Sequence, residues 1–487
     1  MAANGPTRIE IAPVTRIEGH AKITVRLDEE GRPADARLHL TQLRGFEKFC
    51  EGRPFYELPF IMQRICGICP VSHALASAKA CDGILAVTIP EEGARLRKLA
   101  NLAQVIQSHS LSIFYLSAPD LLLGMDAEPA TRSLFGVAAA DPQLARDGVL
   151  LRKLGQQVIA LLAHTGKRVH PGWIVPGGVA TPLTEKAREE ILALQPEALA
   201  AIERSLAWLK RIMERFGPEI RAFANFPTLF MGIVGPNGEL EYSNGWVRVV
   251  DATGKIVADR LDPARSPEYL SEAAEPWTYM KFPRFRKADG AEASSGGTPD
   301  GIVRVGPLAR LNIVDQVDTP LAAQEWSEFR ALERGVVLSS FHYHYARMIE
   351  VLHAIEKIGA MLTQPALDKR VQAKAEPNRN EGIGLAEAPR GMLIHHYKID
   401  DQGLVIWVNL TIATGFNNWA INRGLLQAAK SFITGPEISD GTLNRLEAVV
   451  RAFDPCLSCA SHAIGQMPMR VQLLGPDGMV IHEARRE

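Results

Sequence analysis

Hydrophobic and polar residues alternate along residues 21–27 and again along residues 36–40. A two-residue period of this kind is typical of strands with one buried face. The turn-forming sequence Glu-Gly-Arg-Pro at 30–33 lies between the two runs. These residues predict a strand pair, joined by a turn, in the N-terminal part of the chain.

The period changes from about residue 90. Residues 95–114, 143–164 and 184–216 place apolar side chains every three or four positions and contain few turn formers, and residues 320–363 repeat this pattern. Such spacing puts the apolar side chains on one face of a helix. We therefore expect long helices that pack as a bundle.

Two regions between and after these helices have the pattern of strands. Residues 226–305 contain short alternating runs, separated by turns rich in Gly, Pro, Asn and Ser. They predict a β-rich insertion, in which residues 289–297 form a surface loop. Farther along, residues 392–397 and 404–410 predict a second strand pair.

The C-terminal part contains a helical pattern at residues 438–453 and a predicted hairpin at 470–482. The chain is therefore predicted to be α+β and predominantly helical. Its core is a long-helix bundle, with an N-terminal strand pair, an inserted β-rich region and a C-terminal strand and helix segment. The expected segments are 1–89, 90–225, 226–317, 318–462 and 463–487.

Composition excludes several classes of protein. The 487 residues are 46% hydrophobic, enough for a large core, and carry a formal net charge of −1. Near-neutral charge gives no reason to expect nucleic acid as a partner. The first residues lack the apolar core of a signal peptide, and no charge-free run of 18 apolar residues occurs. We expect a cytoplasmic protein without a membrane span.

The strongest chemical signal is a pair of Cys-x-x-Cys motifs far apart in the chain, Cys66/Cys69 and Cys456/Cys459. Each motif places two thiols close enough to bind one metal, and the fold can bring both pairs to one four-thiolate site. A thioredoxin-like redox pair, a structural zinc site and disulfides remain alternatives, although the sparse cysteines argue against disulfides. Cys50 and Cys81 are expected to be ordinary buried thiols.

The residues around both pairs resemble the two signatures of the large subunit of [NiFe] hydrogenases. Arg-Ile-Cys-Gly-Ile-Cys at 64–69 is followed by His73, and Asp-Pro-Cys-Leu-Ser-Cys at 454–459 is followed by His462. Three more stretches agree in order: Arg-Ile-Glu-Gly-His at 16–20, Arg-Gly-Phe-Glu at 44–47 and Ala-Pro-Arg-Gly at 388–391. The resemblance therefore covers nearly the whole chain. Residues next to Cys69 and Cys459 most resemble the soluble, bidirectional, NAD-coupled members.

This resemblance implies a catalytic subunit that cleaves dihydrogen reversibly and heterolytically. Cys66 and Cys456 would bind nickel alone, while Cys69 and Cys459 would bridge nickel to an iron that carries carbon monoxide and cyanide. Soft thiolates suit such a centre. As a terminal thiolate, Cys456 would also be the catalytic base. Glu18 would receive its proton, because a carboxylate among apolar neighbours exchanges protons near neutral pH.

Further residues are assigned by the same resemblance. Arg390 would lie over the metals and bind cyanide, with Asp454 holding its guanidinium and Pro389 shaping the backbone. His73, one helical turn after Cys69, would hydrogen-bond a bridging sulfur. Thr414 would hydrogen-bond a cyanide.

A second metal site is also implied. Glu47, His462 and the backbone carbonyl of Leu410 would bind a magnesium ion together with waters. One position departs from the family pattern, because Ser108 stands where many members have aspartate. Arg390 would then have one anchor fewer.

Partners follow from what the chain lacks. Gly-x-Gly-x-x-Gly does not occur at a predicted strand-to-helix junction, so NAD, FMN and Fe-S clusters are expected only on partner subunits. These would be diaphorase subunits together with a small hydrogenase subunit. A maturation endopeptidase would remove the extension after His462 or after Ala463. The alternatives are a deazaflavin or quinone acceptor, and a non-catalytic complex I-like or sensory relative.

Overall fold

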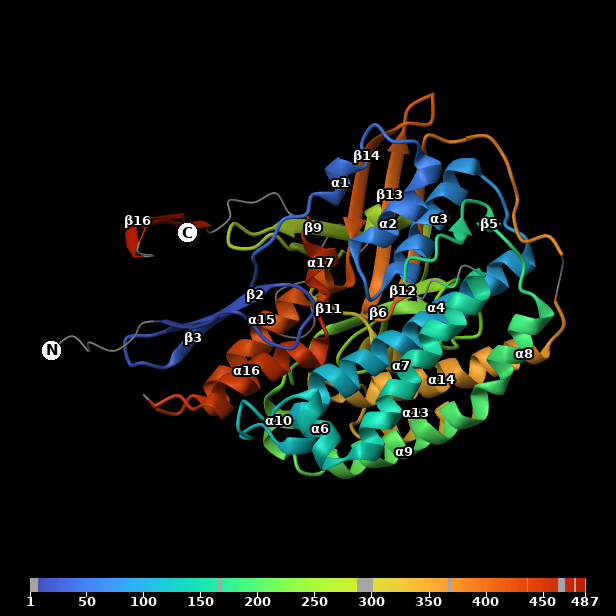
Figure 1. The fold of residues 1–487 in the computed structure, drawn as a ribbon. Coiled ribbons are helices and arrows are strands. Elements are labelled where there is room, and N and C mark those ends of the chain that lie inside the picture. Colours follow the sequence, from blue (N-terminus) through green and yellow to red (C-terminus); the bar gives the residue numbers. More distant parts are fainter. Residues whose placement is uncertain are drawn as a thin grey trace.

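The computed structural model describes residues 8–164, 166, 169–286, 301–366, 369–435, 437–462, 469–476 and 479–486. Figure 1 shows a body of long helices, with a sheet of three strands packed beside them and a second sheet extending from the opposite side. The predicted α+β class with a helical core is confirmed.

The N-terminal sheet has the strand order β1 (Arg8–Ile11), β2 (Ala21–Leu27) and β3 (Pro33–Leu40), all antiparallel. Ile23 pairs with Leu38, and both are completely buried. The predicted strand pair is therefore confirmed, and β1 adds a third strand. This strand is only four residues long, too short to give a clear period in the sequence.

The bundle contains α4 (Glu91–Ser110), α7 (Pro142–Ala163), α9 (Gln195–Met213) and α14 (Tyr343–Thr363). Glycine brings α7 close to its neighbours, since a Cβ at Gly155 would lie 2.5 Å from the carbonyl oxygen of Ala103. The helix expected at 184–216 is divided at Leu194 into α8 (Glu185–Ala193) and α9, because Pro196 lies in the first turn of the second helix. Helix α4 continues as a π-helical segment, η3 (Leu111–Ser117).

The second three-stranded sheet is an antiparallel meander of β12 (Glu381–Ala388), β13 (Gly391–Ile399) and β14 (Val405–Thr411). Helix α3 (Pro70–Leu85) packs directly on β12 (Figure 1). A Cβ at Gly384 would lie 2.0 Å from the carbonyl oxygen of Ala76, so only glycine allows this approach. The pair at 392–397 and 404–410 is confirmed, but β12 was not predicted. Its glycines interrupt the strand pattern, because the sequence there serves close packing.

Helix α15 (Ala413–Phe432) was also not predicted, although most of it is buried. It carries polar residues in the core. Asn422 accepts a hydrogen bond from the backbone N–H of Leu38 at 2.8 Å, and Asn417 accepts one from that of Val305 at 2.9 Å. Such residues hide the apolar period that normally reveals a helix. The predicted last helix is present as α16 (Asp440–Phe453), and the short α17 (Leu457–Ala460) follows it.

The middle region is rich in short strands, as predicted. Strands β11 (Val303–Arg304), β6 (Leu229–Val234), β7 (Trp246–Val250) and β8 (Ile256–Leu261) form one sheet in that order, and β9 (Leu270–Ala274) pairs with β10 (Lys281–Phe285). The loop expected at 289–297 lies outside the described residues.

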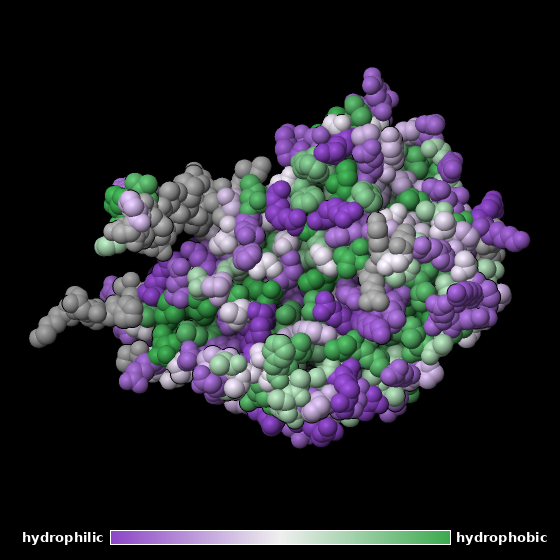
Figure 2. Space-filling model, in the orientation of Figure 1, coloured by the Kyte–Doolittle hydropathy of each residue, from purple (hydrophilic) through white to green (hydrophobic). Residues whose placement is uncertain are grey.

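The predicted C-terminal hairpin is confirmed as β15 (Met469–Leu474) and β16 (Val480–Arg486). Figure 1 shows it apart from the helical body, on the side of β2 and β3. Among the described residues, no helix is both long and apolar enough to cross a membrane. Figure 2 shows polar and hydrophobic residues interspersed over one face.

Shorter elements connect these parts. They are α1 (Phe46–Phe49), η1 (Phe55–Glu57), α2 (Leu58–Met62), η2 (Gln63–Ile65), α5 (Ala118–Leu123), α6 (Leu134–Ala140), β4 (Ile174–Val175), β5 (Gly178–Val179), α10 (Gly217–Ala222), η4 (Pro263–Arg265), α11 (Ser266–Tyr269), α12 (Pro307–Ile313), α13 (Pro320–Arg330) and η5 (Ser340–His342). The largest cluster of buried apolar residues extends from Val14 to Ala460 and draws on each of the first four predicted segments. The borders between segments remain predictions.

Candidate metal centre

The two Cys pairs meet in the interior. Cys69 is the residue before α3, and Cys66 lies in the turn that leads to it. Cys456 is the residue before α17, and Cys459 lies within that helix. The Sγ atoms of Cys66 and Cys456 are 3.3 Å apart, and those of Cys69 and Cys459 are 3.5 Å apart. Chain segments 390 residues apart therefore form one four-sulfur cluster.

All four thiols are buried and free, and their sulfur atoms lie within 4.8 Å of one another. Hydrogen bonds from the neighbouring thiols, Cys456 first, hold the pKa of Cys69 well below its usual range. Burial raises the pKa of Cys456 and Cys459. Four soft ligands in a dry site fit a thiophilic metal. The disulfide and thioredoxin-like alternatives are not supported, because all four sulfurs share one site.

Side chains of α4 hold the first pair in place. Gln104 and Gln107 both donate to the carbonyl oxygen of Ile68, and Gln104 also accepts from the backbone N–H of Val71 at 2.9 Å. The backbone N–H of Ile68 lies 3.2 Å from Sγ of Cys66 and donates to it. Sequence reasoning missed both glutamines, because nothing in a helical pattern distinguishes a buried amide from a surface one.

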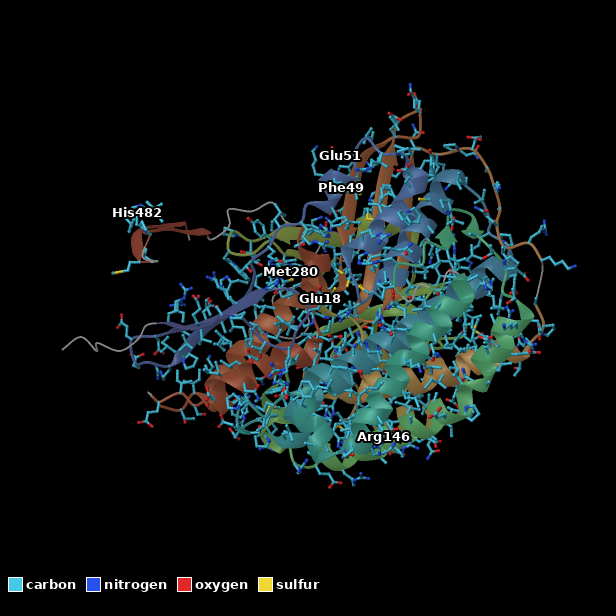
Figure 3. The ribbon with its side chains drawn as sticks, viewed as in Figure 1. Glu18, Phe49, Glu51, Arg146, Met280 and His482 are labelled. Atoms are coloured by element: carbon cyan, nitrogen blue, oxygen red, sulfur yellow. The ribbon has the colours of Figure 1, made fainter. Side chains whose placement is uncertain are left out.

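The second pair is held by the N-terminal segment. Glu18 pairs through its backbone with Cys456, and its Oε2 accepts from the backbone N–H of Ser458 at 3.0 Å. Gly19 has φ +83° and lies so close to Leu457 that a Cβ would be 2.8 Å from that side chain. Figure 3 places Glu18 and Met280 beside α17. Glu18 is thus at the site, half-buried, as a direct neighbour of the predicted base.

Arg16 anchors this segment. Its guanidinium donates to the carbonyl oxygen of Leu116 in η3 at 2.7 Å and to Asp120 at 2.9 Å. A π-helical turn leaves carbonyl groups free for such contacts. The arginine of the Arg-Ile-Glu-Gly-His stretch therefore fixes the position of Glu18.

Arg390 lies over the cysteines. Its Nε donates to the backbone carbonyl of Asp454 at 2.6 Å, and a terminal nitrogen lies 3.1 Å from the Asp454 carboxylate. Burial works against its charge, but Asp454 and the neighbouring thiols raise the pKa of Arg390 above its usual value. A fixed cation therefore faces the sulfur cluster. Ser108 contributes a weaker contact of 3.4 Å, where an aspartate would have provided a second charge.

Two more predicted residues hold the backbone. Oγ1 of Thr414 accepts from the backbone N–H of Cys456 at 2.9 Å. The carbonyl oxygen of Pro389 accepts from Arg310, a completely buried residue that also binds Glu350 and Glu387. Arg310 was not predicted as part of the site. A small cavity above the cluster is bordered by Cys69, Arg390, Leu393, Ile412, Thr414 and Cys459.

His73 faces the other pair. Its Nε2 lies 3.2 Å from Sγ of Cys459, although its spacing from Cys69 placed it over that sulfur. The start of α17 brings Cys459 to the face of α3 that carries His73, so packing between the two helices determines this contact.

The residues predicted for magnesium lie on three different elements. Oε1 of Glu47 accepts from the backbone N–H of Leu410 at 2.7 Å and from Lys281 at 2.6 Å, and burial raises the pKa of Glu47. His462 is buried, and both ring nitrogens lack a hydrogen-bond partner among the described residues. Burial lowers the pKa of His462 to about 3, so the imidazole is neutral. An unpartnered neutral imidazole fits a metal ligand, whereas Lys281 already supplies one cation to Glu47.

Two family models match the chain. One, described as nickel-dependent hydrogenase, matches residues 44–134 and 254–462. The other, described as HoxL-like, matches residues 8–43. The first covers more than half of the chain and includes all four cysteines of the cluster.

Curated relatives agree with these matches. Subunit beta of the NAD-reducing hydrogenase HoxS of Cupriavidus necator is 40% identical over 98% of this chain and 99% of its own length. The related chain of the F420-non-reducing hydrogenase vhc of Methanococcus voltae is 38% identical over 95% of this chain and 96% of its own length.

Solved structures have the same fold. The crystal structure of an NAD+-reducing [NiFe]-hydrogenase in its H2-reduced state has a TM-score of 0.89 and 42% identity, covering 94% of this chain and all of that chain. The Ni-Fe-Se hydrogenase of D. vulgaris Hildenborough has a TM-score of 0.76 and 25% identity, with 94% of this chain covered. The chain therefore belongs to the nickel-dependent hydrogenases, as the catalytic large subunit of a [NiFe] enzyme.

Proposed function

We propose that this subunit cleaves dihydrogen reversibly and passes the electrons through a small Fe-S subunit toward NAD. The observation that carries the proposal is the buried cluster of four thiols beneath the Arg390 guanidinium. A nickel and iron group bound there, with carbon monoxide and cyanide on the iron, would supply an electron-rich centre able to polarise the nonpolar H–H bond.

The cysteines divide between two roles in this proposal. Cys66 and Cys456 bind nickel alone, and Cys69 and Cys459 bridge the two metals. Cys456 is also the base that accepts a proton. Glu18 receives that proton next, because its backbone pairs with Cys456 and its carboxylate lies at Ser458, two residues farther along. Since Glu18 is only half-buried, it can release the proton outward.

Other side chains shape the pocket. Arg390 donates to a cyanide, while Asp454 holds the guanidinium and Pro389 fixes the backbone through Arg310. Thr414 uses its oxygen to accept from Cys456, so its hydroxyl hydrogen remains available to a second cyanide. His73 hydrogen-bonds the bridging Cys459.

A magnesium ion is proposed at Glu47, His462 and the carbonyl of Leu410, completed by waters. The buried unpartnered ring of His462 supports it. Magnesium prefers oxygen ligands and keeps several waters, so a site with few protein ligands is reasonable. Lys281 would then share Glu47 with the ion.

The proposed partners are diaphorase subunits that hold FMN and NAD, together with a small Fe-S subunit. The relative from Cupriavidus necator belongs to an NAD-reducing enzyme, which favours NAD as the acceptor and a cytoplasmic location. Exposed aromatic side chains just before the first Cys pair offer a surface for the small subunit: Phe49 is 52% exposed, Tyr56 60% and Phe60 53%. Figure 3 shows Phe49 and Glu51 at the outer edge of α1.

The C-terminal hairpin is proposed to be removed by a maturation endopeptidase, after His462 or Ala463. Residues Leu473, Met479 and Ile481 of the hairpin region are each more than half exposed, which supports an element that does not contribute to the core. Mass spectrometry of the large subunit from active complex will give its last residue. A large subunit that retains the hairpin in fully active enzyme would contradict this part of the proposal.

A different acceptor is the second candidate, because the relative from Methanococcus voltae belongs to an F420-non-reducing hydrogenase. The decisive experiment purifies the whole complex and measures nickel, iron and H2-dependent reduction of NAD. We expect nickel and iron in equal amounts, infrared bands from iron-bound carbon monoxide and cyanide, and NAD reduction. Bands without NAD reduction would favour another acceptor, and a complex without nickel would overturn the hydrogenase assignment.

A further inference from the structure

A continuous line of buried polar groups leads away from the cluster behind His73. His73 and Ser77 lie one turn apart on α3, and His395 and Tyr397 lie on the same face of β13. Each of the four side chains is completely or almost completely buried. None of them except His73 was predicted from the sequence, because a His-x-Tyr spacing on a strand is common in ordinary cores.

The contacts in this line are short. Nδ1 of His73 lies 3.1 Å from Nε2 of His395. Nδ1 of His395 lies 2.5 Å from the hydroxyl of Tyr397, and this hydroxyl donates to Oγ of Ser77 at 2.8 Å. At its other end, Nε2 of His73 lies 3.2 Å from Sγ of Cys459. Every polar atom in the line therefore has a partner.

The direction of the hydrogen bonds follows from the last contact. Because Tyr397 donates its only hydrogen to Ser77, its oxygen must accept the Nδ1–H of His395. A neutral His395 then has a lone pair on Nε2, which accepts the Nδ1–H of His73. Burial, together with the like charges of His73 and His462, keeps the pKa of His395 well below 6.5, and burial raises that of Tyr397 well above 10. Both groups are therefore neutral, as this arrangement requires.

We propose that His395 and Tyr397 are positioning residues that hold His73 by its Nδ1 and thereby keep its Nε2 directed at the bridging sulfur of Cys459. Ser77 ends the line as the acceptor for Tyr397. The inference rests on the proposed function in one respect, namely that Cys459 is a metal-bound thiolate. A hydrogen bond to such a sulfur withdraws charge from the metals, so the line tunes the cluster from a distance of three side chains.

The geometry also indicates why two elements are needed. On α3 alone, the His73 ring could rotate about its side-chain bonds, because its Nδ1 contacts only a residue of the neighbouring sheet. Helix α3 and the β12–β14 sheet pack closely through the glycines of β12, which fixes the separation between His73 and His395. The sheet therefore sets the orientation of a group that the helix carries.

The test uses the complete, metal-loaded complex and records the infrared bands of the iron-bound ligands. Tyr397→Phe removes one oxygen and leaves the Nδ1–H of His395 without its acceptor. His395→Leu removes the acceptor for His73. We expect both to shift the carbon monoxide band to lower frequency, because a sulfur with a weaker hydrogen bond gives more charge to the metals. His395→Gln keeps an acceptor and should restore much of the original band position.

Two controls separate positioning from general loss of packing. Tyr345→Phe also removes a buried tyrosine hydroxyl, which here donates to Glu325 at 2.7 Å away from the cluster. His396→Gln changes the adjacent strand residue, whose ring contacts Glu381 on the other face. Neither variant should move the bands. Unchanged bands in Tyr397→Phe and His395→Leu, at equal nickel content, would overturn the proposal.

A second measurement does not depend on the metals. A crystal structure of the metal-free Tyr397→Phe protein should show the His73 ring rotated away from Cys459, whereas the unaltered protein should keep the contact. An unmoved ring would contradict the proposal even if the variant failed to load metal. Absence of ligand bands in the unaltered complex would instead refute the proposed function, and the ring orientation would still test the positioning residues.

Discussion

The two Cys pairs bind the same site but are held in different ways. The first pair begins a 16-residue helix, and two glutamines of α4 donate to the same carbonyl of the loop between the cysteines. The second pair lies on a four-residue helix. Its backbone depends on single contacts with Thr414 and Glu18, which are distant in sequence. One half of the site is thus supported redundantly, while the other forms only when distant segments have come together.

The largest expected effect comes from the sulfurs themselves. Replacing Cys459 by alanine should abolish nickel binding and activity, because a bridging ligand is lost and the remaining three thiols cannot hold both metals. Nickel and iron analysis of the purified complex measures this. Cys50→Ala, a buried thiol outside the cluster, is the matched control. Normal nickel content in Cys459→Ala would contradict the four-sulfur site.

Glu18→Gln should lower H2 oxidation by about 10²- to 10⁴-fold, the range for loss of a group that transfers protons. The amide oxygen can still accept from the backbone N–H of Ser458, so the second pair should keep its position and metals. Activity per bound nickel is the measurement. A parallel loss of nickel and activity would assign Glu18 a structural role only.

Thr414→Val leaves the buried N–H of Cys456 without an acceptor, which should cost about 1–3 kcal/mol in the free energy of unfolding. On the other half of the site, Gln107→Leu should cost only about 0.5–1.5 kcal/mol, because Gln104 still donates to Ile68. Denaturant unfolding of the metal-free protein compares the two. Equal costs would mean that the two pairs are supported equally.

Removal of magnesium should have the smallest effect. Chelation should lower the thermal midpoint of the protein by an amount that reflects about 2–3 kcal/mol, the contribution of an ion at about 100 times its dissociation constant. His462→Ala should remove this response, because the proposed ligand directly follows the second pair. His396→Ala, which changes a histidine outside both sites, should retain it. Insensitivity of the unaltered protein to chelation would indicate that the Lys281 ammonium alone serves Glu47.

Long periodic segments were predictable, and polar interiors were not. The helices near 95–114, 143–164 and 438–453 were evident because each buries one regular face. Helix α15 was hidden by asparagines that bind backbone groups of Leu38 and Val305. Strand β12 was hidden by glycines that fit against α3. In both cases the residue is chosen for a partner that lies far away in the chain.

The site shows the same division. Sequence motifs identified Glu18, Arg390, Asp454 and all four cysteines, because the chemistry of the site restricts these residue types. Gln104, Arg310, His395 and Tyr397 have no such signature. Their importance arises from burial beside the site, and amide, guanidinium, imidazole and phenol groups occur in many other settings.

The order and spacing of the residues alone determined that sulfur ligands from both ends of the chain would meet, since only soft donors at that spacing suit such a metal centre. The tertiary structure decided which sulfur His73 contacts and what holds that ring in place. Hydrogen bonds act over about 3 Å, so their partners are fixed by how helices and sheets pack and cannot be read from separations along the chain.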